Sequence, residues 1–212
     1  MAEEGTFVLT KTKERLVVKK LEGRRESPRY YLKPEQVRDL IYHAGNPRDR
    51  CLIKMLAFGG MRREECRQLD IQDIDFDRSL VTLRVAKFGK KRTIPVSQEV
   101  LSDIKFLVGE RLKGPIFESR KSERVSKRQI NRIIEETAAR AGIKNPDPHK
   151  KHLNPHLLRH SFSRNALKAG VRIEVLMEIL GHASIRTTID TYGTPSIDDI
   201  SQEYEKLRKA YG

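Results

Sequence analysis

Apolar residues recur three or four positions apart through most of this chain, a spacing that places them on one face of a helix. Proline or glycine interrupts the pattern repeatedly, so the helices it predicts have defined ends. The predicted helices cover residues 34–45, 48–58, 98–112, 127–141, 155–169, 173–180 and 197–209. Most of the chain is therefore expected to be helical.

One stretch follows a different period. Residues 80–96 (LVTLRVAKFGKKRTIPV) alternate apolar and polar side chains around the sequence Lys-Phe-Gly-Lys. This pattern predicts a β-hairpin with a basic tip. Because strand content is otherwise small, the predicted fold class is α+β and mostly helical, with one small antiparallel sheet.

Residues 1–32 show neither period. The segment is dense in lysine and arginine, and its few apolar residues keep no sustained spacing. We expect a basic, poorly ordered linker or an arm that lies on nucleic acid, and a disordered tail is an equally open alternative. The folded domain is then expected to occupy residues 33–212.

The charge balance narrows the class of partner. The 212 residues include 43 lysines and arginines against 29 acidic residues, a net charge of +14. Such a surplus favours a polyanion as partner, although a generally basic surface has the same composition. No stretch is apolar enough to span a bilayer, and the N-terminus lacks a signal-peptide pattern. Cys51 and Cys66 lie in predicted helices and are expected to be reduced. These features predict a cytoplasmic protein without a membrane partner.

The stretch from Asn154 to Tyr192 holds most of the candidate chemistry. Asn154 before Pro155 is typical of a helix N-cap followed by proline in the first turn. Four polar residues of the next helix recur at a spacing that places them on one face, with apolar residues on another. They are His156, Arg159, His160 and Ser163. We expect the helix to bury its apolar face and to present imidazole and guanidinium groups to an anion.

Further candidates lie outside that helix. His182 follows a glycine that ends the next predicted helix, and Tyr192 comes ten residues later. Arg62 follows a double glycine, which allows a sharp turn and delivers the arginine near a helix start. A surface arginine paired with Glu65 is the plainer interpretation. The hairpin contributes five cations, which form either a solvated turn or a tip that enters a DNA groove: Arg84, Lys87, Lys90, Lys91 and Arg92.

A stripe of histidines raises the question of a metal site. The stripe comprises His149, His152, His156 and His160. Pro155 interrupts any continuous helix through these positions, and neighbouring lysines and arginine would repel a cation. Histidine clusters without cysteine or carboxylate partners are weak signals for zinc. We therefore expect neither a metal nor a cofactor.

Taken together, these motifs resemble a known family. GGMRREEC, the Lys87 hairpin, HLLRHSF, LGHAS and TTIDTYG occur in the order and approximate spacing of the tyrosine recombinase (phage integrase) catalytic domain, over roughly residues 32–211. The resemblance implies that fold, with Tyr192 as the nucleophile. It implies that Arg62 and Arg159 clamp the phosphate and that Lys87 is the general acid. His156 and His182 then correspond to the two active-site histidines.

The resemblance also implies an activity. Such a domain is expected to cleave and rejoin double-stranded DNA through a 3′-phosphotyrosyl intermediate, without metal or ATP, as a site-specific recombinase. A type IB topoisomerase-like enzyme and a non-catalytic DNA-binding module are the alternatives. The other hairpin cations are expected to contact DNA. The protein is expected to assemble as a tetramer on DNA and to be monomeric in isolation. The N-terminal core-binding domain of most members has no counterpart here, so we expect an excised catalytic domain or a short member.

Overall fold

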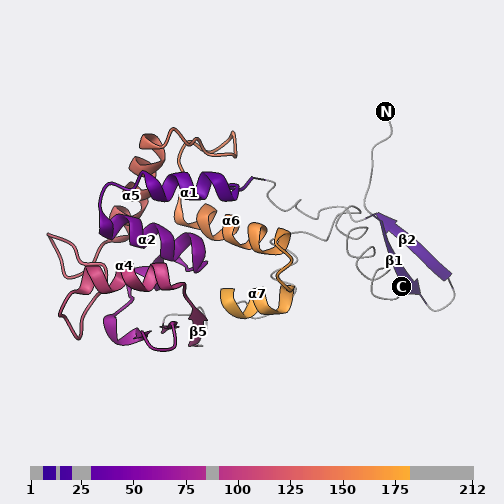
Figure 1. Cartoon of the computed structure of the whole chain (residues 1–212). Coiled ribbons are helices and arrows are strands. Elements are labelled where there is room, and N and C mark those ends of the chain that lie inside the picture. The colour runs from indigo at the N-terminus through magenta and orange to yellow at the C-terminus, as the bar shows by residue number, and fades with distance from the viewer. Residues whose placement is uncertain (1–6, 13–14, 21–29, 85–90, 182–212) are drawn as a thin grey trace, which may run out of the picture. The chain divides into compact units, whose positions relative to one another are not determined.

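The computed structural model describes residues 7–12, 15–20, 30–84 and 91–181 (Figure 1), which divide into two units, and the second of these begins at Tyr30. The first unit contains two antiparallel strands, β1 (Phe7–Thr12) and β2 (Arg15–Lys20), in which Leu9 lies opposite Val18. The sequence analysis predicted no strand here, because the apolar residues of each strand are adjacent rather than alternating. Phenylalanine, valine and threonine, which occur in these strands, have high β-propensity and favour the pairing all the same.

The second unit begins three residues before the predicted domain boundary. Leu32, assigned above to the linker, is fully buried in the core. Its backbone N–H donates to Ser161 Oγ at 2.8 Å, and its carbonyl oxygen accepts from Asn165 Nδ2 at 3.0 Å. The segment before the first helix is therefore part of the domain.

Seven α-helices form most of this unit within the described residues. They are α1 (Pro34–Tyr42), α2 (Pro47–Phe58), α3 (Arg63–Arg67), α4 (Gln98–Val108), α5 (Lys127–Arg140), α6 (Pro155–Lys168) and α7 (Ile173–Leu180). Side-chain caps explain four of the starts, because each capping oxygen accepts the backbone N–H three residues on. These caps are Asn46, Ser97, Ser126 and Asn154. The capped helices begin within one residue of their predicted starts, whereas α4 ends earlier, at Gly109 with φ +54°.

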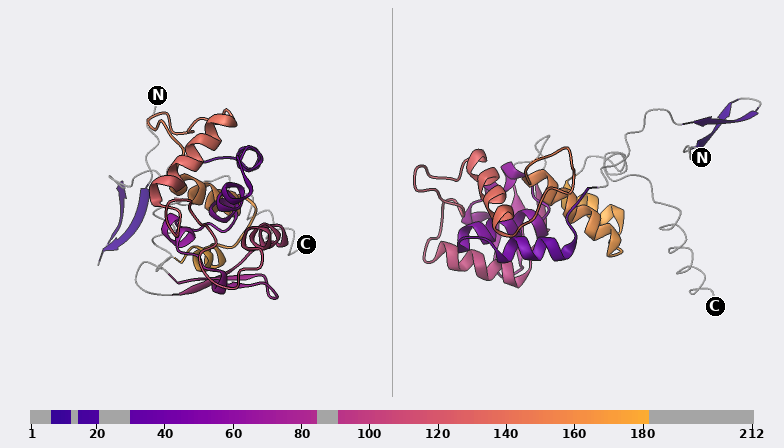
Figure 2. Two further views of the ribbon diagram at one scale, coloured as in Figure 1. Left: turned by 90° about the vertical axis from the view of Figure 1, so that its left-hand side faces the viewer. Right: turned by 90° about the horizontal axis from the view of Figure 1, so that it is seen from above.

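The core is built around α2. This helix is buried continuously from Cys51 to Ala57 and packs against α1, α4 and α6. Figure 2 shows the other helices around it and the small sheet along one side. A second apolar cluster joins α6 to α7, where Leu176 and Leu180 pack against Phe162. No helix in the described ranges is long and apolar enough to cross a membrane.

The three-stranded sheet confirms the predicted hairpin and adds one strand. Its order is β3 (Ile74–Asp75), β4 (Leu80–Leu83) and β5 (Arg92–Pro95), all antiparallel. Leu83 lies opposite Arg92, so the hairpin closes over residues 84–91. Residues 85–90, including Lys87 and Lys90, lie outside the described residues. β3 has two residues, too few for a period to reveal it.

Candidate active site

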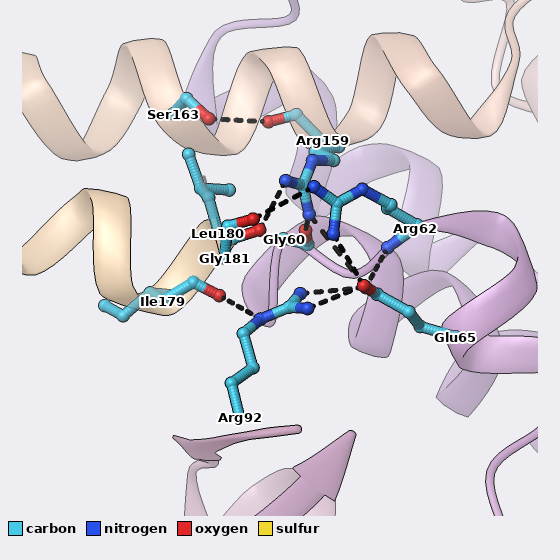
Figure 3. Close-up of polar contacts among 9 residues, drawn as sticks. All are labelled: Gly60, Arg62, Glu65, Arg92, Arg159, Ser163, Ile179, Leu180 and Gly181. Carbon is cyan, nitrogen blue, oxygen red and sulfur yellow. Dashed lines mark hydrogen bonds and ion pairs between the residues drawn. The ribbon is translucent and has the colours of Figure 1, made fainter. Parts of the chain in front are cut away.

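A buried carboxylate joins three arginines that come from separate segments (Figure 3). The Glu65 side chain, on α3, is 1% exposed. Its oxygens accept from the Arg62 backbone N–H and from Arg62 Nη1, each at 2.7 Å. Arg92 of β5 donates Nη1 to Oε1 at 2.6 Å and Nη2 to Oε2 at 2.8 Å. Arg159 Nη1 of α6 lies 4.0 Å from Oε2. These four residues are here called the Glu65 cluster.

The pKa of Glu65 shows which effect dominates in the cluster. Burial by itself would raise the pKa of this carboxyl group, because it disfavours the charged form. Hydrogen bonds from Arg92 and from the Arg62 backbone, together with the charge of Arg92, outweigh burial and lower the pKa of Glu65 below its ordinary value. Glu65 is therefore ionised at neutral pH.

Arg159 is held in place by backbone oxygens. Its Nη1 donates to the Gly60 carbonyl at 2.5 Å, and its Nη2 donates to the Leu180 carbonyl at 2.7 Å. Gly60 has φ +56°, and a Cβ there would lie 2.5 Å from Phe162 Cδ1. Only glycine fits at this position, which explains why the double glycine precedes the cluster.

Arg62 is the N-cap residue of α3, as the double glycine predicted. It also forms the ion pair with Glu65 that the plainer interpretation required, so the two interpretations are compatible. Its Nη2 reaches the Gly181 carbonyl at 3.3 Å. Its side chain is 29% exposed, compared with 6% for Arg159 and 8% for Arg92. Arg62 is therefore the member of the cluster that solvent or a ligand reaches most readily.

The cluster carries more positive than negative charge. Three guanidinium groups surround one carboxylate, which leaves a surplus of two positive charges. A guanidinium has more donors than one carboxylate uses, and planar bidentate contacts to phosphate are its preferred geometry. The arrangement suits an anion that approaches from the side of Arg62.

His156 lies one helical turn before Arg159 on α6 and is exposed. Partial burial of its ring lowers the pKa of His156, and repulsion by Arg159 and Lys150 lowers it further. The imidazole is therefore mostly neutral at pH 7 and able to accept a proton.

The polar face of α6 lies differently from the prediction. The sequence analysis expected it to face outward, but Arg159, His160 and Ser163 are all buried. Ser163 Oγ donates to the Arg159 carbonyl at 3.0 Å. The side chains of Arg159 and Ser163 are paired with backbone oxygens inside the domain, which makes their burial tolerable. Of the predicted polar face, only His156 is exposed.

The two described arginines beside the hairpin tip are both paired with acids. Arg92, predicted to contact DNA, is instead buried against Glu65, and its Nε donates to the Ile179 carbonyl at 2.8 Å. Arg84 binds Asp73 at 2.6 Å and Asp70 at 2.7 Å, and its side chain is 46% exposed. Lys91 is exposed. All three side-chain nitrogens of Arg92 therefore bind acceptors inside the domain, which corrects the DNA-contact prediction for that residue.

Several predicted residues cannot be placed relative to the cluster. Lys87, Lys90, His182 and Tyr192 lie outside the described residues, which end at Gly181. Among the described ranges, no three His, Cys, Asp or Glu side chains are grouped closely enough to hold a metal ion.

Comparison with known proteins identifies the family. The phage integrase family model matches residues 30–196, and the chain belongs to that family. The chain is 38% identical over 146 residues to tyrosine recombinase XerA of Pyrococcus furiosus, which covers 66% of this chain and 48% of that protein. It is 31% identical over 145 residues to tyrosine recombinase XerC of Chromobacterium violaceum, covering 66% and 46%. The chain thus spans about half the length of these curated relatives.

Solved structures confirm the fold. A crystal structure of XerA recombinase matches with a TM-score of 0.70 and 27% identity, over 87% of this chain and 66% of that one. XerH site-specific recombinase bound to its difH substrate matches with a TM-score of 0.69 and 22% identity, over 84% and 54%. The predicted class, a mostly helical α+β tyrosine recombinase catalytic domain, is confirmed.

Proposed function

We propose that this chain is the catalytic domain of a site-specific DNA recombinase that cuts and rejoins DNA through a 3′-phosphotyrosyl intermediate. The observation that carries the proposal is the Glu65 cluster, where Arg62 and Arg159 share one buried carboxylate. Arg62 immediately precedes α3 and Arg159 lies on α6, and Glu65 aligns them without neutralising both. In this proposal the reaction needs neither metal nor ATP.

The arginines act on the scissile phosphate. Attack on a phosphodiester builds negative charge on the non-bridging oxygens, and preorganised donors stabilise that charge. Arg159 is fixed by the carbonyls of Gly60 and Leu180, so little reorganisation is required when the phosphate arrives. Arg62 is more exposed and supplies the outer half of the clamp.

Two proton transfers complete the proposed reaction. Tyrosine has an ordinary pKa of about 10, so the Tyr192 hydroxyl needs a neighbouring acceptor. The lowered pKa of His156 fits that role, because a neutral imidazole is a base. Lys87 protonates the departing 5′-oxygen, and His182 hydrogen-bonds the phosphate. The roles of Tyr192, Lys87 and His182 rest on the family motifs.

Double-stranded DNA is the proposed partner. The solved XerH structure holds its difH substrate, and the net charge of +14 suits a polyanion. Lys90, Lys91 and the half-exposed Arg84 supply phosphate contacts near the hairpin. The protein acts in the cytoplasm and assembles as a tetramer when two DNA sites are paired.

A type IB topoisomerase-like activity would use the same chemistry. Relaxation of supercoiled DNA without exchange between two sites would favour it, whereas recombinant products would favour the recombinase. A non-catalytic module is disfavoured because the sequence keeps both arginines, the hairpin lysine and the tyrosine.

The nucleophile provides the direct test. Tyr192→Phe removes one hydroxyl and is expected to abolish covalent protein–DNA adducts on a nicked suicide substrate, with DNA affinity nearly unchanged. Tyr204→Phe is the matched control and is expected to form adducts at the parental rate. Adducts that persist in the Tyr192 variant and disappear in the Tyr204 variant would reassign the nucleophile. Parent protein that forms no adduct at all would contradict the proposed function.

A further inference from the structure

Arg92 connects three elements of the site through one buried side chain. It begins β5, its two terminal nitrogens bind both oxygens of Glu65 on α3, and its Nε binds the Ile179 carbonyl near the end of α7. The contact with α7 is close, because a Cβ at Gly181 would lie 2.9 Å from Arg92 Cδ. Arg92 therefore fixes the position of α3 relative to the end of α7.

Arg62 contacts the same two elements. It binds Glu65 through its backbone N–H and Nη1, and its Nη2 reaches the Gly181 carbonyl. Arg92 provides two of the four hydrogen bonds that the described residues give to the Glu65 carboxylate. Loss of Arg92 would leave Glu65 and the α7 end free to shift, and Arg62 would shift with them.

The contacts made at position 92 can be made only by an arginine side chain. Its three donors lie in one plane and bind acceptors on two elements at 2.6–2.8 Å. A lysine has a single nitrogen, which can pair with Glu65 but cannot also reproduce the fork and the bond to Ile179. Each of the three side-chain nitrogens of Arg92 binds an acceptor within the domain, which directs its donors to Glu65 and α7 rather than to a DNA phosphate.

We propose that Arg92 is a positioning residue for DNA cleavage, which acts through Glu65 and the end of α7 to hold Arg62 in its phosphate-binding geometry without touching DNA. The inference rests on the proposed function, since it assigns a role within that reaction. It also gives Arg92 a different role from its exposed neighbour Lys91, which is proposed to contact a DNA phosphate.

The first test separates rate from affinity. Arg92→Gln is expected to lower single-turnover cleavage at saturating DNA by roughly 10- to 100-fold, the scale for a displaced reacting group. DNA affinity and its salt dependence are expected to stay parental. A residue that contacts a phosphate would instead reduce the slope of log affinity against log salt by about one. A reduced slope with an intact cleavage rate would overturn the proposal.

Two further variants control for destabilisation. Lys54→Met removes another buried, ion-paired cation, which binds Asp103 and Glu99 away from the cluster, and is expected to cleave at the parental rate where it is folded. Arg92→Lys keeps the charge but loses the fork, and is expected to cleave more slowly than the parent. If Arg92→Gln melts below the assay temperature, Arg92→Lys carries the test. A parental rate in Arg92→Lys would then overturn the proposal.

The pH dependence of the cleavage rate is a further test, because a loss of stability alone does not shift it. The charged groups that face Glu65 are Arg62 before α3, Arg92 on β5 and Arg159 on α6, while α7 presents carbonyls. The adjacent Cys66 thiol stays neutral, because burial raises its pKa. Removing Arg92 raises the pKa of Glu65, so Glu65 is protonated at a higher pH than in the parent. The acid limb of cleavage is expected to move to higher pH in Arg92→Gln and to stay near parental in Arg92→Lys and Lys54→Met.

The outcomes for the two proposals are distinct. If the parent forms no covalent adduct, the proposed function fails and Arg92 has no reaction to support. If the parent cleaves, and Arg92→Gln cleaves at the same rate with the same acid limb, the proposed function stands and the role of Arg92 is wrong.

Discussion

Two of the buried charges in the described part of the domain, Lys54 and Glu65, are opposites. On α2, the Lys54 side chain is 6% exposed and lies 2.6 Å from Asp103 Oδ2 and 2.5 Å from Glu99 Oε1. Burial would lower the pKa of Lys54, but its hydrogen bonds to the two carboxylates raise it. On α3, Glu65 is a buried anion among cations, and its pKa is lowered. In each case partners outweigh desolvation.

The surroundings of Lys54 and of Glu65 differ in the sign of the excess charge and in how far that charge is exposed to solvent. The acids around Lys54 outnumber it, but Glu99 is 66% exposed and is solvated by water. Around Glu65 the excess is cationic, and two of its three arginines are almost fully enclosed. Lys54 therefore forms a closed structural bridge, whereas the Glu65 cluster holds surplus positive charge beside Arg62, whose side chain is 29% exposed. The surplus positive charge of the Glu65 cluster therefore indicates a binding site for an anion.

The largest expected effect is on cleavage. Arg62→Ala and Arg159→Ala are each expected to lower single-turnover adduct formation by roughly 100- to 1000-fold, because each removes a donor to the transition-state oxygens. Lys54→Met is expected to retain the parental rate on the same suicide substrate. Comparable losses at Lys54 and at the two arginines would remove the distinction between bridge and site.

The second expected effect is on stability. Glu65→Gln leaves Arg92 and Arg159 enclosed without a counter-charge, which costs about 3–5 kcal/mol for a broken buried pair. Lys54→Met is expected to cost less, because Glu99 is already in contact with water. Urea unfolding of both variants measures the difference. If Lys54→Met lowers the free energy of unfolding more than Glu65→Gln does, then the exposure of the charged partners left behind does not determine the loss of stability.

The smallest effect concerns the glycine that serves Arg159. Gly60 and Gly170 both have positive φ, but only Gly60 has neighbours where a Cβ would be placed. Alanine at either position incurs backbone strain of about 1–2 kcal/mol. Gly60→Ala is expected to cost about 1–3 kcal/mol more through overlap with Phe162, and to slow cleavage by moving the Gly60 carbonyl. Thermal melts and adduct assays on the pair measure both effects; equal melting temperatures would contradict the role of that overlap.

The sequence predicted the helices well because their ends carry local signals. Asn46, Ser97, Ser126 and Asn154 cap their helices with their own side chains, which requires no knowledge of the rest of the fold. The β1–β2 hairpin was missed because its apolar residues do not alternate. The end of α4 was placed too late because apolar residues continue past Gly109 to Leu112, which is exposed.

The candidate site was only partly predictable for a related reason. Arg62, His156 and Arg159 lie in local motifs, and the Arg62–Glu65 pair spans a single helical turn. The pairing of Arg92 with Glu65 crosses 27 positions, and in the sequence that arginine looks like one more cation of a basic tip. In the folded domain Arg92 is buried and binds Glu65. Burial depends on the tertiary structure, so no local sequence pattern predicts it.

The attachment of Leu32 has a mechanical consequence. Both backbone polar groups of Leu32 are bound by α6, through Ser161 and Asn165, and the Tyr31 ring lies under the cations of Arg164 and Lys168. The chain that enters the domain is thus fastened along the helix that carries His156 and Arg159. A pulling force on the segment that contains Tyr31 and Leu32 therefore acts first on α6. Force applied before residue 30 would load α6 directly.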